Sequence, residues 1–217
     1  MGAATQQWYL KKQAMADKHF ITDYCTIEKG RIKRNGQEVF AASDTSFADF
    51  AKQAYKHAET EYSKFFKMDN LSKLSFLAAD LLLKGQPLDG SNNTALLFAN
   101  ISSSLDTDVK YHDSIADKDD YFPSPAVFVY TLPNICMGEI SIRYKLYTEN
   151  SFFIFEAFNP EFFANYAAIL LDTSRADKVL CGWVEFFNDD YKAFMYLVSK
   201  ESGTDNTIEN IQLLYNS

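Results

Sequence analysis

The stretch that decides the fold runs from 151 to 171 and reads Ser-Phe-Phe-Ile-Phe-Glu-Ala-Phe-Asn-Pro-Glu-Phe-Phe-Ala-Asn-Tyr-Ala-Ala-Ile-Leu-Leu. Its first five residues form a short apolar run, which predicts a strand. A helix is predicted from Asn159 onward, because Asn159 can cap its N-terminus, Pro160 suits its first position and Glu161 favours the positive end of the helix dipole. A strand followed by a tight connection and a helix is the repeating unit of α/β proteins.

The same alternation continues on both sides of this stretch. The predicted elements are a hairpin over 20–40 that turns at Asn35-Gly36, a helix over 47–58 capped by Asp44 or Thr45, a helix over 69–84, a strand over 94–101, strands over 178–187 and 191–199, and a last strand over 208–214. They predict a single domain over 1–217, with 1–40 as an N-terminal extension or hairpin. Strands that alternate with helices indicate a three-layer α/β fold with a mostly parallel sheet.

The composition is that of a folded chain of 217 residues, 47% hydrophobic and 23% charged, with a formal net charge of −8. This charge argues against a nucleic-acid partner, because phosphate binding needs a concentrated basic face. The one basic cluster, 29–34, lies beside the Asn35-Gly36 turn and is interpreted as the solvated side of a hairpin. No apolar run reaches the roughly 18 residues of a spanning helix and the first residues lack a leader pattern, so we expect a cytoplasmic protein without a membrane span.

Residues with catalytic or metal-binding chemistry form no generic site. Cys25, Cys136 and Cys181 lie far apart and are odd in number, so we expect no disulfide framework or zinc site, and small buried apolar roles instead. The three histidines fall in separate segments and are interpreted as surface or structural residues. Phosphate loops, nucleophile elbows and His-Glu-x-x-His pairs are absent from the sequence. We expect neither a metal nor a cofactor.

A more specific pattern lies in the middle of the chain. It consists of Ser124-Pro125-x-x-Phe128-x-x-Thr131-Leu132-Pro133-Asn134, then Gly138-Glu139-Ile140-Ser141-Ile142-Arg143-Tyr144-Lys145-Leu146, and then Asn150. This pattern resembles the stretch before the nucleophile in β-ketoacyl-acyl-carrier-protein synthases of the thiolase superfamily, and the segments 67–74 and 176–185 resemble flanking parts of that family. The resemblance covers residues 65–200. It implies the family's N-terminal domain in truncated form, a three-layer thiolase-like half-fold with a mostly parallel five-stranded sheet.

The resemblance also gives the position of the nucleophile. In active synthases the strand after the Asn150 position ends in a sharp turn whose cysteine starts the next helix, where the dipole lowers the thiol pKa and backbone amides form an oxyanion hole. Here Ala157 occupies that position, Glu156 would repel a developing oxyanion, and Phe158 would fill the acyl approach. The family's two histidines belong to its second half, and no histidine here matches them. The resemblance therefore implies a member without the catalytic cysteine and without condensing activity.

An incomplete condensing fold is expected to need a partner. The helices over 69–84 and after Ala157 would face the missing half with apolar side chains, and the strand over 151–155 is, in the family, an edge that pairs across a two-fold axis. We expect a homo-oligomer or a heteromer with a full-length ketosynthase. Because the chain is acidic, only an indirect link to acyl carrier protein is expected. The candidates to line an interface or acyl tunnel, each of which can also be plain core, are Phe128, Phe152, Phe153, Phe155 and Phe158.

These expectations favour a non-catalytic accessory subunit in bacterial polyketide, polyene or fatty-acid-like biosynthesis. Two alternatives stay open. One is an acyl-transfer enzyme that uses Cys136 or residues of a partner, and the other is a stand-alone module that binds a lipid or an acyl group. The 19 Phe and 13 Tyr residues fit either a bulky core or such a ligand site.

Overall fold

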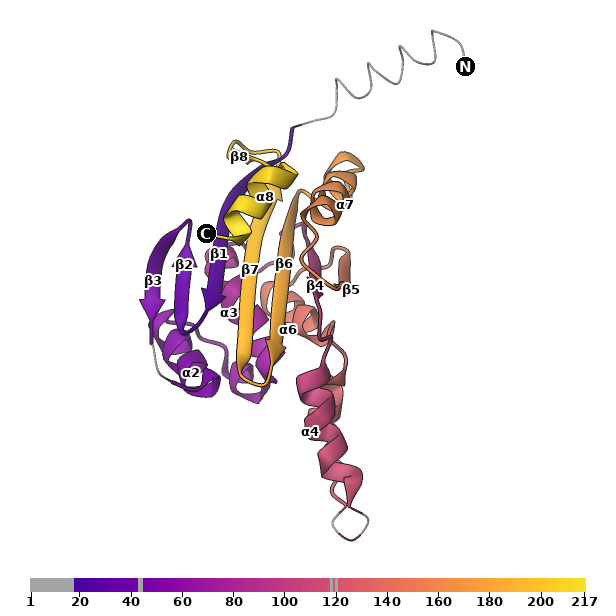
Figure 1. Cartoon of the computed structure of the whole chain (residues 1–217). Helices are drawn as coiled ribbons and strands as arrows, with labels where there is room; N and C mark the ends of the chain where they lie inside the picture. The colour runs from indigo at the N-terminus through magenta and orange to yellow at the C-terminus, as the bar shows by residue number, and fades with distance from the viewer. Residues whose placement is uncertain (1–17, 43–44, 118, 120) are drawn as a thin grey trace.

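The computed structural model describes residues 18–42, 45–117, 119 and 121–217. Figure 1 shows a twisted sheet with helices on both faces and a helical projection that carries α4. In chain order the elements are β1 (Phe20–Glu28), β2 (Arg31–Arg34), β3 (Gln37–Ala41), α2 (Phe47–His57), η1 (Ser63–Lys67), α3 (Asn70–Leu83), β4 (Thr94–Asn100), α4 (Leu105–Ala116), α5 (Pro125–Phe128), η2 (Val129–Thr131), α6 (Ile135–Tyr144), β5 (Asn150–Ile154), α7 (Pro160–Asp172), β6 (Lys178–Phe187), β7 (Asp190–Ser199), β8 (Thr204–Asp205) and α8 (Ile208–Tyr215).

The sheet differs from the prediction in strand number and direction. It has eight strands in the order β3-β2-β1-β7-β6-β4-β5, with β8 paired to β1. Only the β4–β5 and β4–β6 pairs are parallel, whereas the other pairs are antiparallel. The predicted five-stranded, mostly parallel sheet is therefore wrong. The physical reason is that tight hairpins join β1 to β2, β2 to β3 and β6 to β7, and hairpins impose antiparallel pairing. β1 then pairs antiparallel with β7, which is far away in the sequence.

The two edge strands of the sheet are β3 and β5. β3 forms one edge, and its pairing with β2 contains a register shift between Ile32 and Lys33. β5 forms the other edge, where it pairs with β4 in unbroken parallel register. The predicted turn at Asn35-Gly36 joins β2 to β3 with positive φ at both residues (50° and 77°), the backbone that a two-residue hairpin turn requires.

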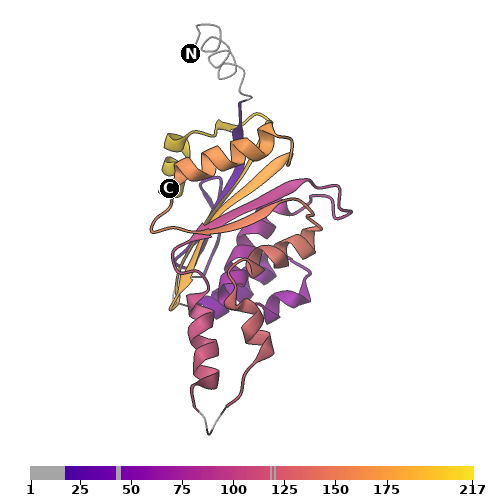
Figure 2. The ribbon, with the colours of Figure 1, turned by 90° about the vertical axis from the view of Figure 1, so that its right-hand side faces the viewer.

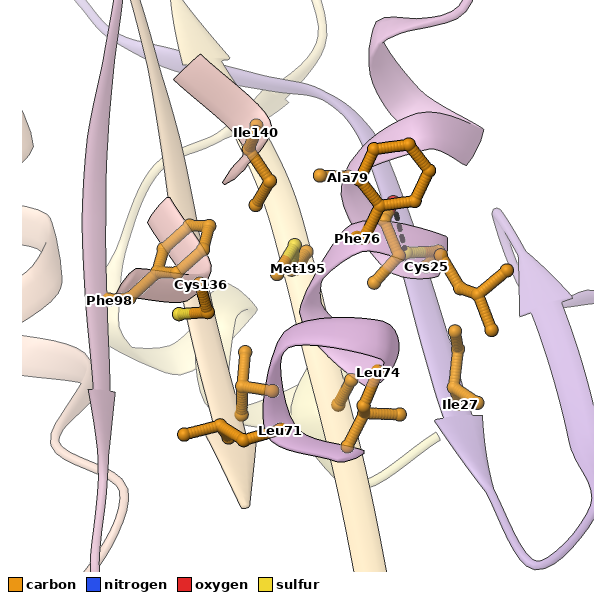
Figure 3. Close-up of a cluster of buried hydrophobic side chains, with 14 of the residues drawn as sticks. Cys25, Ile27, Leu71, Leu74, Phe76, Ala79, Phe98, Cys136, Ile140 and Met195 are labelled. Atoms are coloured by element: carbon orange, nitrogen blue, oxygen red, sulfur yellow. Dashed lines mark hydrogen bonds between the residues drawn. The ribbon is translucent and has the colours of Figure 1, made fainter. Parts of the chain in front are cut away.

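Helices cover both faces, as the predicted three-layer arrangement requires. One hydrophobic core joins α2, α3 and α6 to one face of the sheet, and a second joins α7 and α8 to the other face (Figure 2). Figure 3 shows the first core, to which α3 contributes Leu74 and Phe76, β4 contributes Phe98 and β7 contributes Met195, all fully buried. No helix of the described residues is long and apolar enough to cross a membrane.

Close packing leaves no room for a side chain at one position of β6. A Cβ atom on Gly182 would lie 2.8 Å from Cδ1 of Phe98 on the neighbouring strand. Glycine at this position therefore leaves the space that the Phe98 ring occupies.

Helix α3 is covered on both sides. Eleven of its 14 residues are buried, because it contacts β1, β6 and β7 on one side and α2 and α6 on the other. The expectation that this helix presents an apolar face to a missing half is wrong, since the chain supplies the cover itself. On α7 the exposed residues are mainly polar, and Ile169 is the one large apolar side chain among those described that is exposed there, at 59%.

The C-terminal segment is a helix rather than the predicted strand. Residues Ile208–Tyr215 form α8, which Thr207 caps by accepting a hydrogen bond from the backbone N–H of Asn210 (3.2 Å). Ile211, Leu214 and Tyr215 follow a helical spacing of three and four residues, and all three contact the second core. At α2, Ser46 accepts from the N–H of Asp49 (3.2 Å) and is the cap. Asp44 and residues 1–17 lie outside the described residues.

Candidate functional site

Ala157 lies at the surface, in the connection between β5 and α7. It is exposed, as is Glu156 beside it. The helix begins later in the chain, since Asn159 is the N-cap and accepts a hydrogen bond from the N–H of Phe162 (3.0 Å). The side chain of Asn159 therefore takes one first-turn N–H group of α7, and no nucleophilic side chain lies at Ala157.

The three cysteines offer no activated thiol. Cys25, Cys136 and Cys181 are each at most 1% exposed, and burial raises the pKa of each thiol to about 12. At neutral pH these thiols are protonated and shielded from substrate, which argues against Cys136 as an acyl-transfer nucleophile. The described residues bring no three His, Cys, Asp or Glu side chains together in a way that could hold a metal ion.

Phe158 belongs to the second core. Its ring stacks on Tyr215 of α8 with centroids 4.2 Å apart, and it meets Trp183 and Phe194 edge-on at 5.9 and 5.7 Å. The ring is thus held under α8, away from the connection at Ala157. Its observed contacts are those of a core residue.

The other phenylalanine candidates lie in three separate places. Phe153 and Phe155 are half-buried against Phe162 of α7, with centroids 4.7 and 4.8 Å from its ring. Phe152 points to the opposite face of the sheet and contacts the first core. Phe128, on α5, is 57% exposed and has only Tyr111 of α4 as a ring neighbour, at 5.2 Å, among the described residues. Of the five candidates, only Phe128 presents a largely exposed ring.

The motif residues shape the segment from η2 to β5 rather than a single site. The Thr131 hydroxyl donates to the carbonyl of Phe128 (2.7 Å), and Asn134 precedes α6 without a side-chain cap. Pro133 lies between them, half-buried, and Gly138 lies on α6, where a Cβ would meet no atom within 4 Å. Asn150, which begins β5, is exposed.

Arg143 and Glu139 are the motif's most buried charged groups. The guanidinium of Arg143 lies over the rings of Tyr62 and Tyr144, 5.4 and 5.9 Å from their centroids. The Glu139 carboxylate, 4% exposed, pairs with the ammonium group of Lys64 (2.9 Å) and accepts from the hydroxyl of Tyr130 (3.0 Å). These contacts fix α6 to η1 and η2. The sequence singled out Arg143 but not Glu139, because nothing near Glu139 in the sequence announces its distant partner Lys64.

The β5 edge is open within the part of the chain that the structure describes. β5 pairs with β4 on one side and with no strand on the other. Its burial pattern is half-exposed, and Ile154 at its end is 50% exposed. An unpaired strand with apolar side chains is a template for pairing with another chain.

A helical arm continues from this edge, and we use the name for residues 101–117, 119 and 121–132. α4 and α5 project beyond the end of the sheet (Figures 1 and 2). The arm carries an unusual share of exposed apolar side chains, namely Ile101, Leu105, Val109, Tyr121, Phe122, Phe128, Val129 and Leu132. A gathering of exposed apolar side chains is more typical of an interaction surface than of a solvated helix. The sequence reading missed α4, although Asp106 and Asp108 in its first turn are a helix-start signal.

Hydrogen bonds anchor the base of the arm. The Glu185 carboxylate, on β6, accepts from the backbone N–H groups of Ile101 (2.8 Å) and Ser102 (3.1 Å). The Thr107 hydroxyl donates to the carboxylate of Asp69 (2.7 Å), which also caps α3 by accepting from the backbone N–H of Ser72 (2.9 Å). The arm therefore leaves the sheet in a fixed direction.

Comparison with protein-family models finds no match, and no curated protein matches the chain. Solved structures do match. The ishigamide ketosynthase/chain length factor gives a TM-score of 0.62 at 16% identity, over 84% of this chain and 62% of that chain. A chain from the ketosynthase ApeO in complex with its chain length factor ApeC from Xenorhabdus doucetiae gives 0.56 at 14% identity, over 92% of this chain and 90% of that one.

The chain has a ketosynthase-like fold. A third match, from the complex of a type II polyketide synthase acyl-carrier protein with its hexaketide-bound ketosynthase, agrees, with a TM-score of 0.55 at 14% identity over 85% of this chain and 63% of that chain. The ketosynthase-like recognition drawn from 124–150 is thereby confirmed at the level of fold. The chain spans less than two thirds of the first and third matched chains but nearly all of the second, which is of similar length.

Proposed function

We propose that this chain is a non-catalytic accessory subunit that pairs with a full-length ketosynthase in bacterial polyketide, polyene or fatty-acid-like biosynthesis in the cytoplasm. The observation that carries the proposal is the exposed Ala157, which stands between β5 and α7 of a ketosynthase-like fold where the resemblance places the nucleophilic cysteine. Without a thiolate there the chain cannot hold an acyl group as a thioester. The chain would instead act by shaping or stabilising an active partner subunit.

The β5 edge gives the proposed contact its geometry. Its outward backbone groups can pair with the edge strand of a second ketosynthase-like chain, and Ile154 lies beside that edge at 50% exposure. The same edge could pair with another copy of this chain, so a homo-oligomer is the competing outcome. Co-purification distinguishes the two assemblies, because the heteromer contains a ketosynthase at defined stoichiometry and the homo-oligomer contains this chain alone.

The arm extends the proposed contact beyond the sheet. Ile101 follows the end of β4, whose last residue, Asn100, pairs in register with Ile154, so the apolar surface continues from the edge into the arm. Burial of apolar surface supplies about 25 cal/mol per Å², and the exposed arm residues gain it only on association. Phe128, the exposed candidate, would lie inside this contact.

Partners of the matched structures support the choice of a ketosynthase. One matched structure is a ketosynthase with its chain length factor, and another is a ketosynthase with an acyl-carrier protein. In the proposed complex the ketosynthase contacts the carrier, because this chain carries a net charge of −8 and would repel an acidic carrier protein.

The test is reconstitution with a full-length ketosynthase from the same organism. We expect a complex of one copy of each, measured by size-exclusion chromatography with light scattering. Ile154→Asp, at the edge, should abolish it by placing a charge in the pairing surface. Leu213→Asp, at an exposed position of α8 beside β7, is the control and should leave it intact. A stable monomer that binds no ketosynthase would overturn the proposal.

A further inference from the structure

A hollow lies on the face of the β1–β2 hairpin that α7 and α8 leave open. Ile32 belongs to the first core, so Arg31 and Lys33 on either side of it point to the opposite face of the sheet. The second core, which α7 and α8 build on that face, takes none of the described residues of β2 or β3. The hollow has a volume of about 340 Å³ and is lined by Thr26, Glu28, Lys29, Arg31 and Lys33.

The hollow contains a nearly buried hydroxyl without a partner. Thr26 lies between Cys25 and Ile27, which belong to the first core, so its side chain points to the face that carries the hollow. Thr26 is 4% exposed, yet its hydroxyl makes no hydrogen bond to any described residue. Its oxygen still touches solvent. Because buried polar groups are ordinarily hydrogen-bonded, this hydroxyl is a donor that a ligand in the hollow can use.

Three cationic side chains surround this hydroxyl. Lys33 lies directly opposite Thr26 in the register of β1 and β2, and Lys29 lies in the turn between the two strands. Neither ammonium group has a carboxylate of the described residues within ion-pair distance. The Arg31 guanidinium has Glu38 at 3.6 Å, with both side chains exposed, and a pair of this kind is weak. All three cations are therefore available to an anion.

The carboxylate in the lining already has a counter-charge. Glu28 pairs with the ammonium group of Lys192 on β7 at 3.7 Å. Lys192 is itself held in place, because it donates to the backbone carbonyl of Tyr215 (3.1 Å) and lies over the Tyr215 ring, 4.0 Å from its centroid. The lining thus combines three cations with one paired carboxylate. Although the chain as a whole has a net charge of −8, the local potential in the hollow favours an anion.

The turn between β1 and β2 keeps a lysine in a conformation that suits other residues better. Lys29 and Gly30 both have positive φ, 48° and 71°, as a two-residue hairpin turn requires, and its first position favours Asn or Gly. The next turn of the sheet has the favoured pair, Asn35-Gly36. A lysine at φ 48° costs backbone free energy, and such costs are characteristic of functional positions. The ammonium group of Lys29 is thereby placed beside the hollow.

We propose that this hollow binds a phosphoryl group, either as free phosphate or as the end of a small phosphate monoester. The Thr26 hydroxyl donates to one oxygen, and the three cations meet the others. A phosphoryl group fits better than a carboxylate, because at neutral pH it carries close to two negative charges and three strong acceptor oxygens. The hollow lies toward the β3 edge of the sheet, away from β5, so the proposal stands independently of ketosynthase pairing.

The test titrates three probes into the full chain: glycerol 3-phosphate, inorganic phosphate and acetate. Binding is followed by calorimetry and by NMR chemical-shift changes of residues 26–33. We expect both phosphates to shift these residues and to bind about tenfold or more tightly than acetate, the difference expected for one additional charge-assisted hydrogen bond. Tighter binding of glycerol 3-phosphate identifies a monoester as the ligand, and equal affinity of the two phosphates identifies free phosphate. Acetate binding as tightly as phosphate, or no shift in 26–33, would overturn the proposal.

Variants separate this site from a general attraction of anions to lysines. Thr26→Val removes the hydroxyl but keeps a β-branched side chain, and should weaken phosphate binding about tenfold. Lys33→Gln should weaken it about threefold or more, and keeps the test decisive if Thr26→Val fails to fold. Lys67→Gln is the matched control, because Lys67 is an exposed lysine of η1, which packs on the first core, and this variant should bind phosphate unchanged. Phosphate affinity that is the same in all folded variants would refute the site.

Discussion

The ring of Phe158 stacks on the ring of Tyr215, with centroids 4.2 Å apart and planes inclined by 18°. This contact ties the connection after β5 to the last helix, and the same Phe158 ring also touches Trp183 and Phe194. Phe158→Ala should therefore lower the free energy of unfolding by about 2–4 kcal/mol, since it leaves a void and removes aromatic contacts. Urea unfolding measures this.

Phe128→Ala is the control for that experiment, because its ring is 57% exposed and a change there should stay within about 0.5 kcal/mol. In a ketosynthase-binding assay the larger effect should come from the other variant: Phe128→Ala should weaken the complex, and Phe158→Ala should not. If Phe158→Ala weakens binding and Phe128→Ala does not, Phe158 is the interface residue.

Restoring a cysteine at the vacant position should not restore chemistry. In Ala157→Cys the thiol would be exposed and two positions before the cap Asn159, beyond the first turn where the helix dipole acts. We expect an ordinary exposed thiol that iodoacetamide alkylates. Intact-mass measurement should find no acyl adduct after incubation with an acyl thioester. Accumulation of an acyl-enzyme in this variant would contradict the geometry.

The three native thiols should be inert in the folded protein. Each has a pKa raised by burial to about 12, so the thiolate fraction at neutral pH is negligible. Mass spectrometry after iodoacetamide treatment should show no labelling of folded protein and three labels after denaturation in guanidinium chloride. Selective labelling of Cys136 in the folded state would revive the acyl-transfer alternative.

Asp69 should make stability depend on pH. Burial raises the pKa of its carboxyl, against the hydrogen bonds from Ser72 and Thr107 that lower it. A carboxyl with a raised folded-state pKa contributes stability that is fully present below the unfolded pKa and is lost as pH rises through the folded pKa. Asp69→Asn does not titrate and keeps a cap acceptor. As the pH rises from acid to neutral, the unfolding free energy of Asp69→Asn should therefore increase relative to that of the unchanged protein. A difference between the two that does not vary with pH would contradict this.

The anchor of the arm should be measurable by hydrogen exchange. Glu185→Gln replaces a charged acceptor with a neutral one, so the N–H groups of Ile101 and Ser102 should exchange faster. A loss of stability of about 1–2 kcal/mol should accompany this. Glu156→Gln, in the exposed connection after β5, is the control and should alter neither. Unchanged exchange in Glu185→Gln would mean that the arm is held by other contacts.

Sequence patterns predicted the elements whose signals are local. β4, buried at every position, and α7, with its Asn159 cap and Pro160, form where their sequences indicate. The 208–214 segment was misread as a strand because its apolar residues outweighed the cap at Thr207 and the helical spacing of Ile211 and Leu214. Strand direction was misjudged because nothing local shows that β1 pairs with β7, far away in the sequence.

In the candidate site, too, local features could be predicted from the sequence, and features that depend on distant contacts could not. Ala157 could be located by counting from Asn150, since the distance along the chain is fixed by the resemblance. The packing of Phe158 in the core could not be predicted, because its contact with Tyr215 depends on a helix at the far end of the chain. Likewise, the exposed arm follows from Glu185 holding the turn after β4, a contact between residues more than eighty positions apart.

The two edges of the sheet are not equivalent. The β3 edge carries the register shift between Ile32 and Lys33 and the exposed ion pair of Arg31 with Glu38 (3.6 Å), both of which resist pairing with another strand. The β5 edge has neither feature. A chain with one receptive edge can add one neighbour by strand pairing and no more. The proposed assembly through β5 would therefore be self-terminating, because fibrous growth by this route has no second end from which to proceed.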